Sequence, residues 1–171
     1  YPFRTILTGF LCGDIDSKEA SRRMFSLYEN YTKENFYLNL NLVGSHDRGR
    51  ILTVLGKGKG IETTEDKSYA ALKLSDGERE LAIRKLRLLV LMQMTHPGIP
   101  SIYYGDEIGM EGGTDPYNRA PYNWEQRDSS IMELYRSAIA LRKEYPVFVD
   151  GSFEPCSMGE DVYGYRRTNK E

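Results

Sequence analysis

Cysteine and histidine are scarce in this sequence. It contains two cysteines and two histidines among 171 residues. Cys12 and Cys156 are too few for a disulfide framework, and they lack metal-ligand spacing with His46 or His96. The sequence therefore predicts no metal site and no bound cofactor. A reducing compartment is compatible with this cysteine content, and we expect a cytoplasmic protein.

The sequence also lacks an excess of charge of one sign, and it lacks long apolar runs. Its 23 basic and 25 acidic residues leave a formal charge of −2. We therefore expect no nucleic-acid partner and no membrane partner. No signal peptide or membrane-spanning run is present. The first residues, Tyr1-Pro2-Phe3-Arg4, lack an initiator methionine and resemble the middle of a longer chain.

Helices are predicted where apolar residues recur at helical spacing. The first covers about residues 3–11 and is ended by Gly13. The apolar second half of a helix ending near Thr95 predicts burial on more than one side. His96, which precedes a proline, is predicted to be a helix-end residue. Capping-box patterns predict the start of the other helices, at Asp16 with Glu19, Ser75 with Glu78, and Ser130 with Glu133.

A strand that ends in polar residues is predicted after the second helix. Leu38, Leu40 and Leu42 alternate with neighbouring residues over 36–43, with the two-residue period of a pleated strand. The run ends on Ser45-His46-Asp47. A carboxylate and an imidazole then lie where a strand enters a loop, the place where an α/β barrel positions reacting groups. On the pattern alone, a polar turn that merely closes the strand is the favoured alternative.

The order of the elements predicts an α/β architecture that is cut short at its front. A second strand is predicted over residues 99–104, and the polar, glycine-rich stretch 56–76 is predicted to be a surface loop. From Gly151 onward the pattern changes to short extended pieces. We therefore expect a domain boundary near Asp150, with one domain over 1–150 and a second beginning at 151.

Three stretches, in this order along the chain, resemble motifs of glycoside hydrolase family 13, the α-amylase family. The first two resemble the motifs of its seventh and eighth barrel strands. The third resembles a loop of the neopullulanase, cyclomaltodextrinase and maltogenic amylase group. These stretches are Asn41–Arg50, Pro97–Met110 and Asp115–Trp124.

The resemblance implies a fold for each part of the chain. Residues 1–150 would be the C-terminal portion of a (β/α)8 TIM barrel, and residues 151–171 the first strands of a β-sandwich C-domain. The family's nucleophilic aspartate and acid/base glutamate would lie on strands upstream of Tyr1. The resemblance therefore implies a fragment of a retaining α-glucan hydrolase that is inactive by itself.

The resemblance also implies a role for four side chains. Asp47 matches the family's third catalytic carboxylate, and His46 matches the histidine that binds the same sugar ring. Asp115 and Arg119 match a pair that binds the next sugar, so α-glucan oligosaccharides are the expected partners. Arg50 matches a position that we interpret as structural.

Several alternatives stay open at this point. Asp115 and Arg119 are also compatible with a surface salt bridge of little energetic value, and Trp124 with loop packing rather than a sugar platform. The sequence determines neither which linkage is cleaved nor whether the reaction is hydrolysis or transglycosylation. An alternative from another class is a non-catalytic module that forms a homo-oligomer, or assembles with a partner, through exposed barrel edges.

Overall fold

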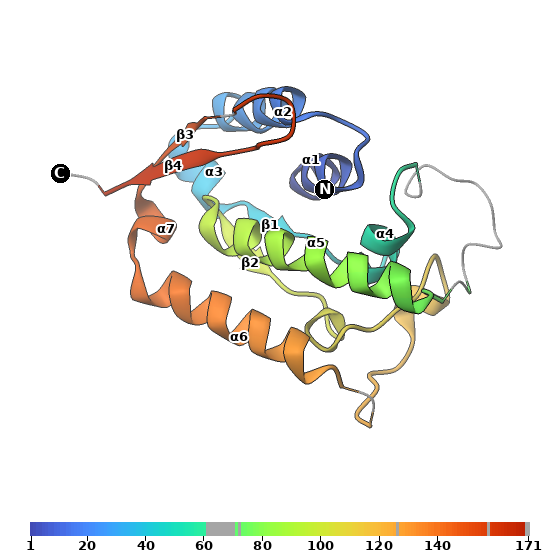
Figure 1. Ribbon diagram of the computed structural model, residues 1–171. Coiled ribbons are helices and arrows are strands. Elements are labelled where there is room, and N and C mark those ends of the chain that lie inside the picture. Colours follow the sequence, from blue (N-terminus) through green and yellow to red (C-terminus); the bar gives the residue numbers. More distant parts are fainter. Residues whose placement is uncertain (61–70, 72, 126, 157, 170–171) are drawn as a thin grey trace.

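A parallel pair of short strands lies among the helices in the computed structural model. The structure describes residues 1–60, 71, 73–125, 127–156 and 158–169. Figure 1 shows α5 crossing the middle of the molecule, with α1 and α2 on one side and α6 on the other. The helices are α1 (Pro2–Cys12), α2 (Ser17–Glu29), α3 (Lys33–Leu38), α4 (Ile51–Lys57), α5 (Asp76–Thr95), α6 (Ser129–Glu144) and α7 (Val147–Asp150). The strands are β1 (Leu40–Leu42), β2 (Ile99–Ser101), β3 (Ser152–Pro155) and β4 (Tyr165–Thr168), and two 3₁₀ turns are η3 (Asp106–Ile108) and η4 (Tyr117–Arg119).

The parallel strands β1 and β2 bring two distant parts of the chain side by side. Leu40 pairs with Ile99 and Leu42 with Ser101. The buried Gln93 side chain of α5 donates to the carbonyl oxygens of Asn41 (2.8 Å) and Ser101 (2.9 Å). One amide therefore binds both strands, and the two strands end at the same edge, where polar side chains of both can meet.

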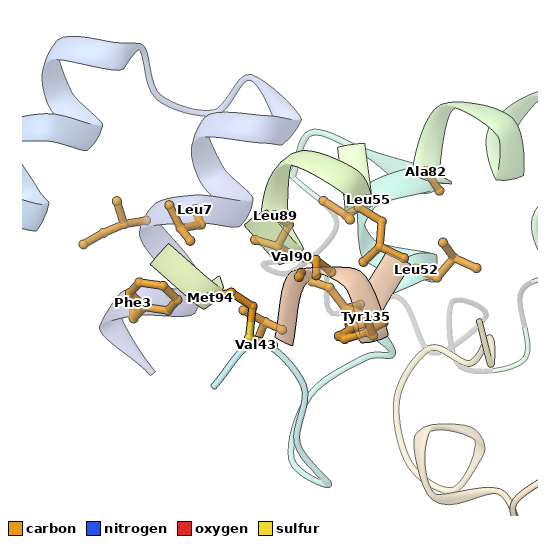
Figure 2. Close-up of a cluster of buried hydrophobic side chains, with 14 of the residues drawn as sticks. Phe3, Leu7, Val43, Leu52, Leu55, Ala82, Leu89, Val90, Met94 and Tyr135 are labelled. Atoms are coloured by element: carbon orange, nitrogen blue, oxygen red, sulfur yellow. The ribbon is translucent and has the colours of Figure 1, made fainter. Parts of the chain in front are cut away.

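The core lies where α1, α4, α5 and α6 pack together. Leu7, Leu55 and Leu89 are fully buried, and Figure 2 shows them converging from three helices, with Tyr135 from a fourth. Burying each such leucine stabilises the fold by roughly 1.5–3 kcal/mol relative to exposure. None of the helices in the described part of the chain has the length and apolar content needed to cross a bilayer.

Local capping signals correctly predicted one end each of α1, α2 and α5, whereas α3, α4 and α7 were not predicted. Gly13 ends α1 in a left-handed conformation, the Asp16 side chain accepts a hydrogen bond from the backbone of Glu19, and Ser75 with Glu78 forms the predicted capping box. The predicted start of α6 was wrong, because its N-cap is Asp128 and not Ser130. Asp128 also pairs with Arg79 of α5, at 3.0 Å, which is a contact that no local pattern contains.

The predicted extent of the first strand and the predicted burial of α5 were also wrong in part. Residues 36–38 belong to α3, and β1 covers only Leu40–Leu42 of the predicted stretch 36–43. On α5, Leu88 (55% exposed) and Leu91 (46%) face outward. In the stretch predicted as a loop, residues 56–57 end α4, whereas 61–70 and 72 lie outside the described residues.

His96 connects α5 to the C-terminal hairpin formed by β3 and β4. It is the C-cap of α5, as predicted, and its ring is buried against Phe3, Phe153 and Tyr165. Its Nδ1 atom lies 2.9 Å from the Met92 carbonyl and its Nε2 atom 2.8 Å from the Tyr163 hydroxyl. A carbonyl only accepts, so Nδ1 carries the proton and the neutral ring accepts at Nε2. Burial lowers the pKa of His96 to about 3.

We predict a stability that depends on the protonation of His96. The unfolded chain binds a proton near pH 6.5 and the native ring does not until about pH 3. As the pH is lowered between these values, this group should therefore decrease the free energy of unfolding by roughly 1.4 kcal/mol per pH unit. Burial raises the pKa of Asp106 to about 7, which gives an overlapping contribution of opposite sign. The quantity to measure is thus the difference in slope between the wild type and His96→Gln.

Urea unfolding from pH 7 to 5 measures this difference, with His46→Gln as the matched control, since His46 is exposed. We expect the pH slope of His96→Gln to differ from that of the wild type by the contribution of His96, and the slope of His46→Gln to equal that of the wild type. Equal slopes for the wild type and His96→Gln would contradict the assignment.

Candidate functional site

A tight turn at the end of β1 carries the first two predicted site residues. Gly44 precedes this turn, and a Cβ atom there would lie 2.0 Å from Asp106 Oδ2. Only glycine therefore allows the end of β1 to pass so close to the residues that follow β2. The Ser45 Oγ atom accepts from the Asp47 backbone N–H at 3.2 Å, which stabilises the turn that presents Asp47.

Asp47 and His46 are adjacent and open to solvent. The Asp47 side chain is 52% exposed and that of His46 is 66% exposed, with 3.2 Å between Nε2 and Oδ1. The Tyr1 hydroxyl donates to Asp47 Oδ2 at 2.7 Å. This hydrogen bond is the main reason why the pKa of Asp47 lies below its ordinary value of 3.8, with His46 and Arg119 contributing. Asp47 is therefore an exposed anion at neutral pH, available to a ligand.

The second predicted pair lies beside the same turn. Arg119 Nε donates to the carbonyl oxygen of His46 at 3.0 Å and lies 3.3 Å from Asp115 Oδ1. The peptide bond after Asp115 is cis. Arg119 and Asp115 are both half-exposed or more, so they pair with each other and still face solvent. The structure thus brings all four predicted residues into one cluster.

Asn118 holds this cluster together, and the sequence reasoning missed it. Its buried side chain donates to the carbonyl oxygens of His46 (2.8 Å) and Arg48 (3.1 Å). Two carbonyls of the turn are thereby fixed by one amide, at a position between the two predicted loop residues. A motif match names residues by type, but this contact joins segments some 70 residues apart and has no local signal.

Beneath the cluster lies a buried cation that the sequence indicated only as structural. The Arg50 side chain is fully buried, 3.5 Å from the Asp106 carboxylate. Its guanidinium lies 4.5 Å from the ring centroids of both Tyr103 and Tyr104, and it donates to the Tyr104 carbonyl. Arg50 therefore connects the turn after β1 to the segment after β2, and it has no exposed group left to meet a ligand.

Glu107 and Trp124 differ in their exposure to solvent. The Glu107 Oε2 atom is buried, which agrees with a structural carboxylate. Trp124, by contrast, is 69% exposed, although its ring also contacts Tyr122 and Arg127 of its own loop. Within the described residues, no group of three or more histidines, cysteines, aspartates or glutamates is close enough to hold a metal ion.

Comparisons with known proteins agree on one family. The family model of the α-amylase catalytic domain matches residues 13–129. An amylopullulanase from Thermoanaerobacter thermohydrosulfuricus is 37% identical over 153 residues, covering 90% of this chain and 10% of that protein. A cyclomaltodextrinase from Geobacillus thermopakistaniensis is 37% identical over 151 residues, covering 87% of this chain and 22% of that protein.

Similarity extends to solved structures. The debranching enzyme of Nostoc punctiforme superposes with a TM-score of 0.80 at 26% identity, covering 99% of this chain and 34% of that one. The chain thus spans 10% and 22% of the length of the two curated relatives named above.

We predict that Tyr1→Phe raises the pKa of Asp47. The substitution keeps the ring and removes the hydroxyl that stabilises the charged carboxylate. NMR titration of the Asp47 carboxyl measures the shift. Tyr31→Phe is the matched control, since Tyr31 is an exposed tyrosine outside the cluster. Identical Asp47 titrations in the two variants would show that the hydroxyl has no such effect.

Proposed function

This chain belongs to the family of the α-amylase catalytic domain, and from that premise we propose that it is part of a retaining α-glucan hydrolase. The observation that carries the proposal is the clustering of Asp47, His46, Asp115 and Arg119 at the end of β1. These residues were identified from two separate motifs, Asn41–Arg50 and Asp115–Trp124. A chain without this function has no need to bring them together with their polar groups exposed.

The exposed anion suits the chemistry of glycoside cleavage. The transition state resembles an oxocarbenium ion, and hydrogen bonds to sugar hydroxyls strengthen as it forms. Asp47 accepts such bonds and lies as a negative charge near the developing positive one. His46 donates from its imidazole to the same ring. Asp115 and Arg119 offer an acceptor and donors to the next sugar unit.

The chain by itself is proposed to be inactive. Retaining hydrolysis needs two carboxyl groups about 5–5.5 Å apart, one as nucleophile and one as acid/base. Asp47 and Asp115 have the substrate-binding roles above, and Glu107 is partly buried. The resemblance to the family implies that the nucleophile and the acid/base lie on strands upstream of Tyr1, and we propose that they lie outside this chain. The substrates proposed are maltodextrins, cyclodextrins or pullulan, through α-1,4 and also α-1,6 links, because the relatives include an amylopullulanase and a cyclomaltodextrinase.

The proposed fold follows from the same premise. A parallel β1–β2 pair with α5 between its strands in sequence is a βαβ arrangement, and the cluster lies where these strands end, as in a barrel enzyme. We propose that residues 1–150 form the C-terminal portion of a (β/α)8 barrel. The antiparallel β3–β4 pair is proposed to begin a β-sandwich domain at 151–171.

We predict that the 171-residue chain does not hydrolyse maltodextrins, whereas the full-length gene product does. In the full-length protein, Asp47→Asn should lower kcat on the order of 10²–10³-fold, the scale of losing one transition-state-stabilising group. Asp161→Asn is the matched control, because Asp161 is an exposed aspartate of the C-terminal hairpin. Reducing-sugar assays measure both. Equal kcat for the wild type and Asp47→Asn would remove Asp47 from the mechanism.

A second candidate function is self-association, and exposed apolar residues around the strands favour it. Leu38 (68% exposed), Leu40 (56%) and Ile99 (45%) lie at or beside β1 and β2. Neither strand has a second neighbour in the described sheet. Unpaired edges with apolar side chains associate with further chains.

If the chain self-associates there, light scattering should show a mass that rises with concentration, and Leu40→Ser should reduce this rise. Leu81→Ser removes a leucine that is also exposed, on α5, and should leave it unchanged. A concentration-independent monomer would exclude this function.

A further inference from the structure

The loop that carries Asp115 and Arg119 also presents an aromatic surface several residues further on. From this surface we propose a second glucan-binding site formed by Tyr122, Trp124 and Arg127, which we term the Trp124 platform. The proposal rests on the proposed function, because it takes the same class of ligand. It adds a site that the cluster around Asp47 does not contain.

The platform is exposed and nevertheless held in place. Trp124 is 69% exposed, and the Tyr122 ring lies 4.6 Å from it at an interplanar angle of 55°. The Arg127 guanidinium lies 5.4 Å from the indole, and Arg127 Nε donates to the Trp124 carbonyl at 2.8 Å. Leaving so large an apolar ring in water forfeits the free energy of its burial. A ligand that covers the ring recovers it.

A cavity of about 710 Å³ adjoins the platform, a size typical of ligand sites. Asn123 and Glu125, which flank Trp124, line it, and Arg127 belongs both to the cavity and to the platform. The remaining charged residues that line it come from neighbouring segments: Lys73, Arg79, Glu111 and Asp128.

The charges of this cavity indicate a neutral ligand. Three cations (Lys73, Arg79, Arg127) and three carboxylates (Glu111, Glu125, Asp128) line it, so their formal charges cancel. Arg79 is moreover paired with both Glu111 (2.6 Å) and Asp128 (3.0 Å). A phosphate or a metal ion gains no net attraction here. A sugar chain instead offers hydroxyls to the polar groups and an apolar ring face to Trp124, which is an amphipathic side chain.

The platform lies close enough to the first cluster for one oligosaccharide to reach both. Arg119 and Trp124 are five residues apart, so their Cα atoms are separated by at most about 18 Å. A glucan held at the Asp47 cluster can therefore continue along this loop, and a second glucan chain can also bind at the platform alone.

The fluorescence of Trp124 tests the proposal directly, because it is the only tryptophan in the chain. We expect maltoheptaose to shift its emission and to protect it from acrylamide quenching in the 171-residue chain. Cellohexaose, with β-1,4 links, should do neither. An Asp115→Ala, Arg119→Ala double variant with unchanged circular dichroism should keep the tryptophan response, because the platform does not use these residues.

Isothermal titration calorimetry measures the loss of affinity when the platform is removed. Trp124→Ala should weaken maltoheptaose binding about three- to tenfold, and Tyr31→Ala, which removes another exposed aromatic residue, should not. NMR signals of the His46 ring report on the Asp47 cluster in the same titration. A response of Trp124 without one at His46 supports the platform and contradicts the proposed function of the cluster.

Three outcomes would overturn the Trp124 platform. One is a response at His46 with an unchanged tryptophan, which leaves the proposed function intact. Another is loss of the tryptophan response in the double variant, which would make the platform part of the first cluster. The third is an equal response to cellohexaose, which would contradict an α-glucan site. A titration in which neither Trp124 nor His46 responds would overturn both proposals.

Discussion

The buried guanidinium of Arg50 is the contact on which the arrangement around Asp47 depends. It lies against Asp106 and against the rings of both Tyr103 and Tyr104, so it joins the segment after β1 to the segment after β2. The Arg50 backbone N–H donates to Gly112 O at 2.9 Å. This hydrogen bond also connects Arg50 to the loop that follows η3. Removing either charge of a buried pair leaves the other uncompensated, at a cost of about 3–5 kcal/mol. Such a pair fixes geometry more than it adds net stability.

Around this contact, buried side-chain amides bind backbone carbonyl groups, whereas the residues proposed to bind a ligand are exposed to solvent. Gln93 binds both strands and Asn118 binds two carbonyls of the turn. Neither presents its side chain at the surface. The buried hydrogen bonds thereby restrict the backbone conformation of the segments that carry the exposed residues Asp47, His46 and Arg119. This division suits a binding surface, because ligand-contacting groups keep their hydrogen-bonding capacity while their positions are set from below.

The loop that follows β2 extends this surface. Its first part is fixed to the turn through Arg119 and Asn118. Its last part presents Trp124, whose neighbours Asn123 and Glu125 line a charge-balanced cavity. Between them, Tyr104 donates to Ala120 O at 2.9 Å and keeps the loop against the end of β2. One loop thus offers polar groups at one end and an aromatic face at the other, which are the two kinds of contact a sugar chain makes.

The starts of α2 and α5, the end of α1 and the motifs that contain the four cluster residues could be recognised in the sequence because their signals are local. Asp16, Gly13 and the Ser75–Glu78 pair act within one turn of the helix that they cap, and each motif is contiguous. The assignment to the α-amylase family likewise needed only the order of those motifs. The start of α6 was mispredicted although its cap is local, because Asp128 and Ser130 are both favoured N-cap residues and only the structure shows that the Asp128 side chain accepts from the backbone N–H groups of Ser130 and Ile131.

What only the tertiary structure decided is how distant segments meet. The sequence determined that Asp47, His46, Asp115 and Arg119 are present, yet not that Arg119 reaches the His46 carbonyl across 73 residues. It also did not determine that residues 36–38 form a helix, that Arg50 is buried, or that Trp124 is exposed. Burial and hydrogen bonding of this kind depend on which surfaces pack together, and side-chain type and spacing along the chain do not specify that.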